Sequence, residues 1–151
     1  MRRVIATLTT LAGLACALPV AAQFAKPEDA VKYRKGAFQV MGAHFGRIGA
    51  MVNGKAPFDA AAAASNAEIA AFASKLPYAG FVEGTSSTEK GGPKPIVWSE
   101  RPKFDDYAKK MQDEMGKLLV SARGGNQEQI KASFDTTAKA CKSCHDDFRN
   151  P

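Results

Sequence analysis

Apolar residues recur at intervals of three and four positions in four separate segments of this 151-residue chain, and no segment shows the strict alternation of a half-buried strand. Such a period is typical of helices that bury one face against their neighbours. The length suits a single domain with a modest core. The pattern therefore predicts an all-α fold.

The first two segments carry residues that begin and end helices. One helix is expected from about Pro27, which suits a first turn, to about Asn53, with Gly54 after it. A second is expected over about 59–76, rich in alanine from Ala60 to Ala64. The predicted core residues are Val31, Phe38, Met41, Phe45, Ile48 and Val52 in the first helix and Ile69, Phe72 and Leu76 in the second.

A segment that breaks the helical period follows the second helix. Residues 77–98 hold several prolines and glycines, so they are predicted to form a long crossover loop. Phe81 and Trp98 are large apolar residues within it, and we expect them to tie the loop to the helices.

The last two helices lie close together along the chain. The third should begin near Ser99 or Glu100 and end at the glycine pair 124–125. Asn126 should cap the fourth helix, with Gln129 at the third position as in a capping box. Two short connections and one long crossover loop between the second and third helices predict an antiparallel four-helix bundle.

Residues 1–22 have the composition of a secretory signal peptide. Two arginines precede a short apolar run over 4–18, and small residues follow before an expected cleavage between Ala22 and Gln23. The run is too short for a membrane anchor, and no later apolar stretch reaches spanning length. We therefore expect an exported protein of residues 23–151, without membrane insertion after the signal is removed.

The exported chain is mildly basic. Lys and Arg number 21 against 15 Asp and Glu, and loss of the two arginines of the leader leaves 19 basic residues and a net charge of +4. These charges are scattered along the chain rather than gathered in one stretch. The distribution does not suggest nucleic-acid binding.

The last predicted helix carries the motif CKSCH, from Cys141 to His145. On a helix, Cys141, Cys144 and His145 project from neighbouring positions. Because Cys16 lies in the leader, these two are the only cysteines of the exported chain. A zinc site, a redox dithiol, an unligated structural pair and haem attachment could each use such a motif.

Haem attachment suits the rest of the chain best. Zinc normally takes four ligands, and only His44 remains to complete a set, about 120° away from the core stripe of its helix. A thioredoxin-like dithiol follows a strand in a βαβ unit, and the chain shows no such pattern. In a c-type haem site each thiol adds to a vinyl group and the adjacent imidazole reaches the iron. Export agrees with this reading, because c-type attachment in bacteria follows secretion.

The position of the motif, on the last helix of the chain, is similar to that in class II cytochromes c. The chain resembles the cytochrome c′ family over essentially all of residues 23–151. The stretches that carry the resemblance are QFAKPEDAVKYRKGAF, HFGRI, the Trp-Ser pair before the third helix and CKSCHDDFR. The resemblance implies a left-handed four-helix bundle, one covalent haem c per chain, a periplasmic location and a homodimer. The first two helices, with the small residues Ala60–Ala64, are the candidate interface.

The resemblance also implies roles for single residues. His145 would be the proximal ligand of a five-coordinate, high-spin iron, and Cys141 and Cys144 would form the thioethers. Arg34 would lie near a haem propionate, and Arg149 beside the proximal histidine. The alternatives are a solvated helix charge for Arg34 and a helix C-terminal cation for Arg149.

Two residues of the first helix bear on the open side of the iron. Phe38 lies where the family places an apolar residue over that side, although a plain core aromatic is the alternative reading. Met41 lies about one turn further on, and in low-spin relatives a first-helix methionine binds the iron. Core packing is the alternative for Met41.

These expectations define the predicted function. An apolar pocket penalises water and anions, which lose hydrogen bonds on entry, whereas NO and CO need no such partner. We expect NO and CO to bind after displacement of Phe38, and electrons to pass to an unidentified periplasmic redox partner. The resemblance adds that NO can release the proximal histidine and remain near Arg149. The alternative is a low-spin electron carrier with Met41 as sixth ligand. No distal acid–base pair is visible, so enzyme activity is not expected.

Overall fold

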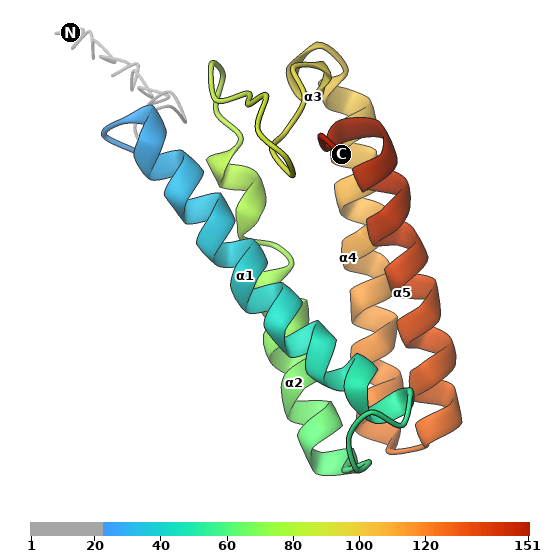
Figure 1. Ribbon diagram of the computed structural model, residues 1–151. Helices are drawn as coiled ribbons and strands as arrows, with labels where there is room; N and C mark the ends of the chain where they lie inside the picture. The colour runs from blue at the N-terminus through green and yellow to red at the C-terminus, as the bar shows by residue number, and fades with distance from the viewer. Residues whose placement is uncertain (1–22) are drawn as a thin grey trace, which may run out of the picture.

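The computed structural model describes residues 23–151, and the leader expected at 1–22 lies outside the described residues. Four long helices form the fold: α1 Pro27–Val52, α2 Ala60–Ala73, α4 Arg101–Gly124 and α5 Gln127–Phe148. α1 and α2 form one antiparallel pair and α4 and α5 the other, and the pairs meet at the end where their turns lie (Figure 1). The predicted all-α four-helix bundle is confirmed. Between residues 23 and 151, no helix is long and apolar enough to cross a membrane.

The helix ends lie close to the predicted ones. α1 ends at Val52, and the Asn53 side chain donates to the backbone oxygen of Gly49 at 2.9 Å. Asn126 caps α5 as predicted, because its side chain accepts from the backbone N–H of Gln129 at 3.0 Å. Gly125 ends α4 with a φ of 72°, a left-handed conformation that glycine adopts without strain.

The second helix buries a different face from the predicted one. Ile69 and Phe72 are 41% and 68% exposed, so their assignment to the core was wrong. Alanines at most 1% exposed form the buried face instead: Ala63, Ala67, Ala70 and Ala73. Because α2 packs against both α1 and α4, its small face permits the closest approach, and its larger side chains are left outside. α2 also ends before Leu76, which is half-buried.

The crossover between α2 and α4 packs tightly against the bundle. It contains a 3₁₀ turn, Pro77–Gly80, and a short helix, α3 Ile96–Ser99. The predicted anchors are confirmed, since the Phe81 ring lies 4.8 Å from that of Phe104 on α4 and 6.4 Å from that of Trp98. The turn also touches α1, because a Cβ at Gly80 would lie only 2.6 Å from the Ala30 carbonyl oxygen.

The predicted apolar stripe of α1 is buried only in part. Ile48 and Val52 are buried in the core near the C-terminal end of α1, together with Met51. Phe38, Met41 and Phe45 are only half-buried, although they continue the same stripe. They line an open cavity, which explains their partial exposure, and Met41 and Phe45 also pack against the core.

A buried threonine joins the last two helices. Thr137 of α5 is fully buried, and its hydroxyl lies 3.2 Å from the carbonyl oxygen of Glu114 on α4 and 2.8 Å from that of Ser133. The first contact is between helices and the second within α5. This hydroxyl therefore adds a buried polar tie to the α4–α5 interface, which also contains the Ser121–Ser133 hydroxyl pair at 2.7 Å.

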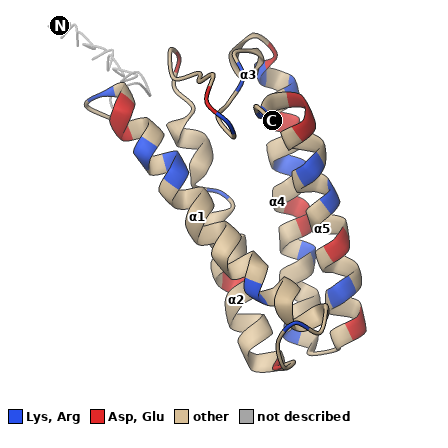
Figure 2. Ribbon diagram, viewed as in Figure 1, with Lys and Arg blue, Asp and Glu red and all other residues tan. Residues whose placement is uncertain are grey.

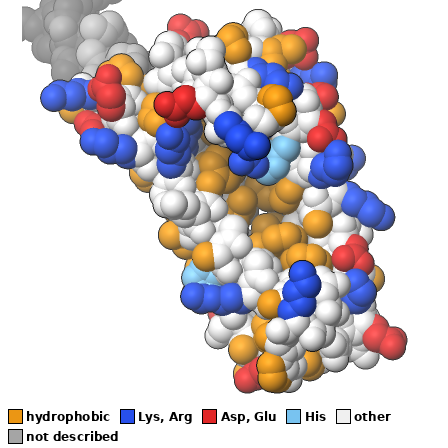
Figure 3. All heavy atoms as spheres, in the orientation of Figure 1, with side chains coloured by type: hydrophobic (Ala, Val, Ile, Leu, Met, Phe, Trp, Pro, Cys, Tyr) orange, Lys and Arg blue, Asp and Glu red, His pale blue; other side chains and the backbone are white. Residues whose placement is uncertain are grey.

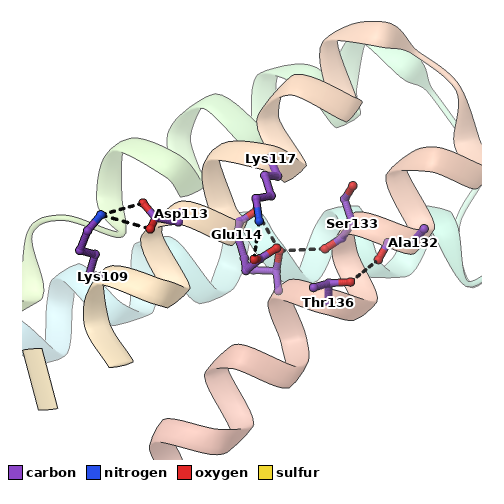
Figure 4. A network of polar contacts seen from close by, with 8 residues as sticks. Lys109, Asp113, Glu114, Lys117, Ala132, Ser133 and Thr136 are labelled. Carbon is purple, nitrogen blue, oxygen red and sulfur yellow. Dashed lines mark hydrogen bonds and ion pairs between the residues drawn. The ribbon is translucent and has the colours of Figure 1, made fainter. Parts of the chain in front are cut away.

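Charged residues of both signs are interspersed along α1, α4 and α5 (Figure 2). Several form ion pairs one turn apart, such as the exposed pair Lys109–Asp113 at 3.2 Å and the pair of Lys117 with the half-buried Glu114 at 2.7 Å (Figure 4). Exposed pairs of this kind contribute only about 0.3–0.5 kcal/mol each. The bundle therefore depends mainly on its apolar packing.

Candidate functional site

A cavity of about 720 Å³ lies between α1, the crossover, α4 and α5. Its floor is largely hydrophobic, and Lys and Arg side chains stand near its mouth (Figure 3). The volume lies in the range of sites that hold cofactors and other small molecules. All the predicted site residues line it: Arg34, Phe38, Met41, Cys141, Cys144, His145 and Arg149.

The two cysteines lie on the α5 wall of this cavity. Both are half-buried free thiols. Burial raises the pKa of Cys141, and burial together with the charges of Cys141 and Asp147 raises the pKa of Cys144 to about 11. A redox dithiol requires the opposite, a lowered thiol pKa that produces thiolate near neutral pH. The site therefore lacks the electrostatics of a disulfide oxidoreductase.

The zinc alternative finds little support in the geometry. Among residues 23–151, no group of three or more His, Cys, Asp or Glu side chains is placed to hold a metal ion. His44 does not line the cavity, and its Nδ1 lies 2.8 Å from the side-chain oxygen of Asn66 on α2. This contact places His44 in the α1–α2 interface rather than with the cysteines.

Arg34 is a buried cation, only 3% exposed. Its guanidinium donates to the carbonyl oxygen of Gly80 at 3.0 Å and to the hydroxyl and carbonyl oxygens of Thr85, each at 2.6 Å. It also lies 4.9 Å from the centre of the Phe81 ring. These partners are neutral, and burial lowers the pKa of Arg34. The alternative of a solvated helix charge is therefore wrong for Arg34.

The lack of a counter-ion tests whether the cavity suits a haem. Within residues 23–151, Arg34 forms no ion pair, although a buried charge normally requires one. An acidic group on a molecule in the cavity would supply it, and the propionates of a haem are such groups. With two thiols and an imidazole on the α5 wall, the residues present fit the group.

His145 and Arg149 lie one turn apart at the end of α5. His145 is an exposed residue of the cavity wall, and partial desolvation lowers its pKa, with the charge of Arg149 adding to the effect and Asp146 opposing it. A neutral imidazole is the form that ligates metals. Arg149 follows the last residue of α5, and its Nε donates to the carbonyl oxygen of Gly91 at 3.2 Å. The crossover and the C-terminus therefore meet beside His145.

Aromatic residues of the crossover and α1 form the wall around Phe38. Its ring lies 6.3 Å from that of Tyr78 and 6.2 Å from that of Phe81, in edge-to-face contact with both. Met41 lines the same cavity. Tyr78 is a site residue that the sequence did not predict. Its place directly after Pro77, where the helical period breaks, was the available signal.

Further cavity residues that the sequence did not predict come from α4. Phe104, Tyr107, Met111 and Met115 line the cavity, although core packing is what their positions along the helix favour. Their apolar spacing is the same for a packed helix face and for a cavity wall. The distance between α1 and α4 decides whether this face is packed or lines a cavity, and the sequence does not show that distance.

A helical bundle whose cavity is bordered by a C-x-x-C-H motif at its C-terminal end defines a c-type cytochrome of class II. Comparison with known proteins identifies the family within this class. The family model described as Cytochrome C' matches residues 29–149. Cytochrome c′ from Alcaligenes xylosoxydans xylosoxydans is 42% identical over 84% of this chain and 98% of that protein. Cytochrome c′ from Rubrivivax gelatinosus is 44% identical over the same shares. The chain belongs to the cytochrome c′ family.

Solved structures agree with this assignment. The crystal structure of Rubrivivax gelatinosus cytochrome c′ has a TM-score of 0.79 over 85% of this chain and all of that chain, at 44% identity. Cytochrome c prime from Shewanella frigidimarina has a TM-score of 0.80 over the same shares at 36% identity. A variant of cytochrome c prime from Alcaligenes xylosoxidans, with a TM-score of 0.78 at 41% identity, is a nitric oxide complex. The family implies a c-type haem, and Cys141 and Cys144 are present for its covalent attachment.

Proposed function

We propose that this chain is a periplasmic c-type haem protein whose five-coordinate, high-spin iron binds NO and CO and can transfer electrons. Cys141 and Cys144 would hold the haem through thioethers, and His145 would ligate its iron. The bound haem would supply an iron centre that takes up one diatomic molecule or one electron. The nitric oxide complex of an Alcaligenes relative supports the choice of ligand.

The observation that carries the proposal is the chemistry of the cavity wall. Among the residues that line it there is no Asp or Glu, and His145 is its only imidazole. The Phe38 side of the cavity therefore offers no second imidazole as a ligand. Water and anions would lose hydrogen bonds on entering such a wall, whereas neutral diatomics would lose none. The same lining supports a binding protein rather than an enzyme, because it holds no acid–base pair.

Two arginines complete the proposed site. Arg34 would pair with a haem propionate, and its burial without an ionic partner supports that role. Arg149 would lie beside the proximal histidine, where its charge already affects the pKa of His145. Phe38 would cover the open side of the iron and would have to move aside for a ligand to enter.

A second function follows from one further residue in the cavity. Met41 lines the same space as Phe38, so its thioether is available as a sixth ligand. Ligation by Met41 would close the site to gases and leave only electron carriage, to a periplasmic redox partner. We favour gas binding because Phe38, with its aromatic neighbours, occupies the same wall.

We also infer that residues 1–22 are a signal peptide cleaved near Ala22 and Gln23, and that the exported chain forms a homodimer through α1 and α2. Four large hydrophobic side chains on these helices are exposed: Tyr33 at 36%, Val40 at 47%, Ile69 at 41% and Phe72 at 68%. Within the stretch Ala60–Ala64, Ala63 is buried in the core and unavailable for contact. The expected interface is therefore centred on Ile69 and Phe72.

The optical spectrum of the purified haem protein tests the proposal. In the dithionite-reduced state, we expect a broad high-spin spectrum that changes on addition of NO or CO. A sharp low-spin spectrum that neither gas alters would contradict gas binding and favour electron carriage with Met41 as ligand. Absence of covalent haem after export with a bacterial haem-attachment system would contradict both functions.

A further inference from the structure

A segment of the crossover, Ser87–Lys94, pairs with the C-terminal end of the chain, and we call it the strap. The two backbones exchange hydrogen bonds in a short ladder around a bridge between Pro93 and Arg149. Lys94 N–H donates to the Phe148 oxygen at 2.9 Å, Gly91 N–H to the Asn150 oxygen at 3.1 Å, and Asn150 N–H to the Gly92 oxygen at 2.8 Å. The ladder lies beside the cavity, since Gly91, Gly92, Pro93 and Arg149 all line it.

Two side chains fasten this ladder. The amide nitrogen of Asn150 donates to the backbone oxygens of Ser87 and Glu89, the latter at 3.1 Å. In the other direction, Lys94 Nζ lies 3.0 Å from the backbone oxygens of both Asp146 and Asp147. These are carbonyls of the last turn of α5, which lack partners within the helix. The strap therefore caps the same turn that carries His145.

Arg149 is held at the centre of this arrangement. Its Nε donates to the Gly91 oxygen at 3.2 Å. Gly91 has a φ of 76°, and a Cβ at this position would lie 2.8 Å from Nη2 of Arg149. The guanidinium thus packs directly over a residue that has no side chain. Gly91 therefore provides both the left-handed backbone conformation and the free space that the position of Arg149 requires.

We infer that the strap is a positioning device that holds the guanidinium of Arg149 at the cavity wall beside His145. The inference rests on the proposed function, because it concerns how long NO stays on the His145 side of the cavity. Gly91 and Asn150 act through Arg149 and are positioning residues. A loosened strap lets the exposed Arg149 side chain leave the cavity wall, and the cavity then loses the guanidinium that lies one turn from His145.

The experiment compares four single variants and one double variant of the haem-loaded protein. Asn150→Ala removes the two side-chain bonds to the strap, and Gly91→Ala removes the space under Arg149. Arg149→Ala removes the positioned group itself. The matched control is Thr88→Ala, an exposed residue of the strap whose side chain makes none of these contacts. Helix content by circular dichroism verifies that each variant is folded.

The main measurement is the rate of NO release into excess dithionite. We expect Asn150→Ala, Gly91→Ala and Arg149→Ala to release NO about fivefold faster than the wild type. This factor corresponds to the free energy of one lost hydrogen bond. Thr88→Ala should release NO at the wild-type rate. The double variant Asn150→Ala with Arg149→Ala should be no faster than Arg149→Ala alone, because both changes act through one group.

A second measurement does not depend on NO. In the reduced, CO-bound or metal-free protein, the Arg149 Nε–H should exchange slowly with solvent and should lose that protection in Asn150→Ala. Equal exchange of the Arg149 Nε–H in the wild type and in Asn150→Ala would overturn the inference. It would also be overturned if Arg149→Ala released NO faster than the wild type while Asn150→Ala and Gly91→Ala released it at the wild-type rate. A wild type that binds no NO at all would refute the proposed function, and the exchange of Arg149 would still decide whether the strap holds it.

Discussion

The ring of Phe38 meets the ring of Tyr78 edge to face, with centroids 6.3 Å apart and planes inclined by 80°. Phe81 meets Phe38 in nearly the same way, at 6.2 Å and 81°. The Phe38 side chain, which we propose covers the open side of the iron, is therefore held by contacts with the crossover. Each aromatic contact of this kind is worth about 0.5–1.5 kcal/mol, so displacing Phe38 has a definite cost.

This contact predicts a graded change in ligand entry when Phe38 is shortened. Phe38→Leu should speed CO binding to the reduced protein, and Phe38→Ala should speed it further, because each change removes ring contacts that must break before a ligand enters. Stopped-flow mixing with CO measures the rates. Equal rates in all three proteins would show that Phe38 is a core aromatic and not a gate.

Met41 decides between the two proposed functions. We expect Met41→Leu, which conserves the volume of the side chain, to leave the optical spectrum of the reduced protein unchanged. A change from low-spin to high-spin on this substitution would identify Met41 as the sixth ligand. Met51→Leu is the matched control, because Met51 lies on the same helix in the closed part of the core, where it is 6% exposed.

The exposed side chains of α2 predict the effect of a charge on assembly. Phe72→Glu should convert the homodimer to a monomer, since a carboxylate at the centre of the proposed interface would be buried without a partner. Sedimentation at micromolar concentration measures the mass. Val120→Glu is the control, because Val120 is 71% exposed on α4, outside the proposed interface. A dimer that persists in Phe72→Glu would refute this location.

Much of the fold could be predicted from sequence because its signals are local. The cap at Asn126, the glycine after α4 and the proline in the first turn of α1 each act within one turn of the chain. The spacing within C-x-x-C-H is equally local, because residues three and four positions apart share one face of a helix. Cys141, Cys144 and His145 accordingly lie together on one wall of the cavity.

What the sequence did not show depends on distant partners. Ile69 and Phe72 have the spacing of core residues, but the alanine stripe beside them permits closer packing against two helices, and only the assembled bundle decides between the faces. The role of Arg34 as a tie to Thr85 spans 51 residues. The contact of Asn150 with Ser87 spans 63 residues, and no local pattern announces it.

Tyr78 predicts a pH dependence of stability in the alkaline range. Burial raises its pKa above the ordinary value of 10.0, and this cause remains when the two cysteines form uncharged thioethers. Below pH 10.0 the phenol of Tyr78 keeps its proton in both the folded and the unfolded protein. Above it the unfolded state ionises first, so stability is lost as the pH rises from the ordinary value toward the raised one.

The thermal midpoint at several pH values between neutrality and the alkaline limit measures this effect. We expect the midpoint to fall with pH in the wild type and to fall less steeply in Tyr78→Phe, which has no phenol to ionise. Tyr33→Phe is the control, because Tyr33 is 36% exposed and lies outside the cavity. Identical slopes in wild type and Tyr78→Phe would show that the phenol of Tyr78 is not buried in the native protein.

The buried hydroxyl of Thr137 predicts a measurable loss of stability. Thr137→Val keeps the shape of the side chain but removes the bond to the Glu114 oxygen across the α4–α5 interface, at a cost of about 1 kcal/mol. Thr136→Val is the matched control, because the exposed Thr136 hydroxyl bonds only to the Ala132 oxygen of its own helix, at 3.0 Å (Figure 4). Urea unfolding measures both variants. If the two lose equal stability, the cost arises from the helix propensity of valine, and the polar tie between α4 and α5 contributes nothing.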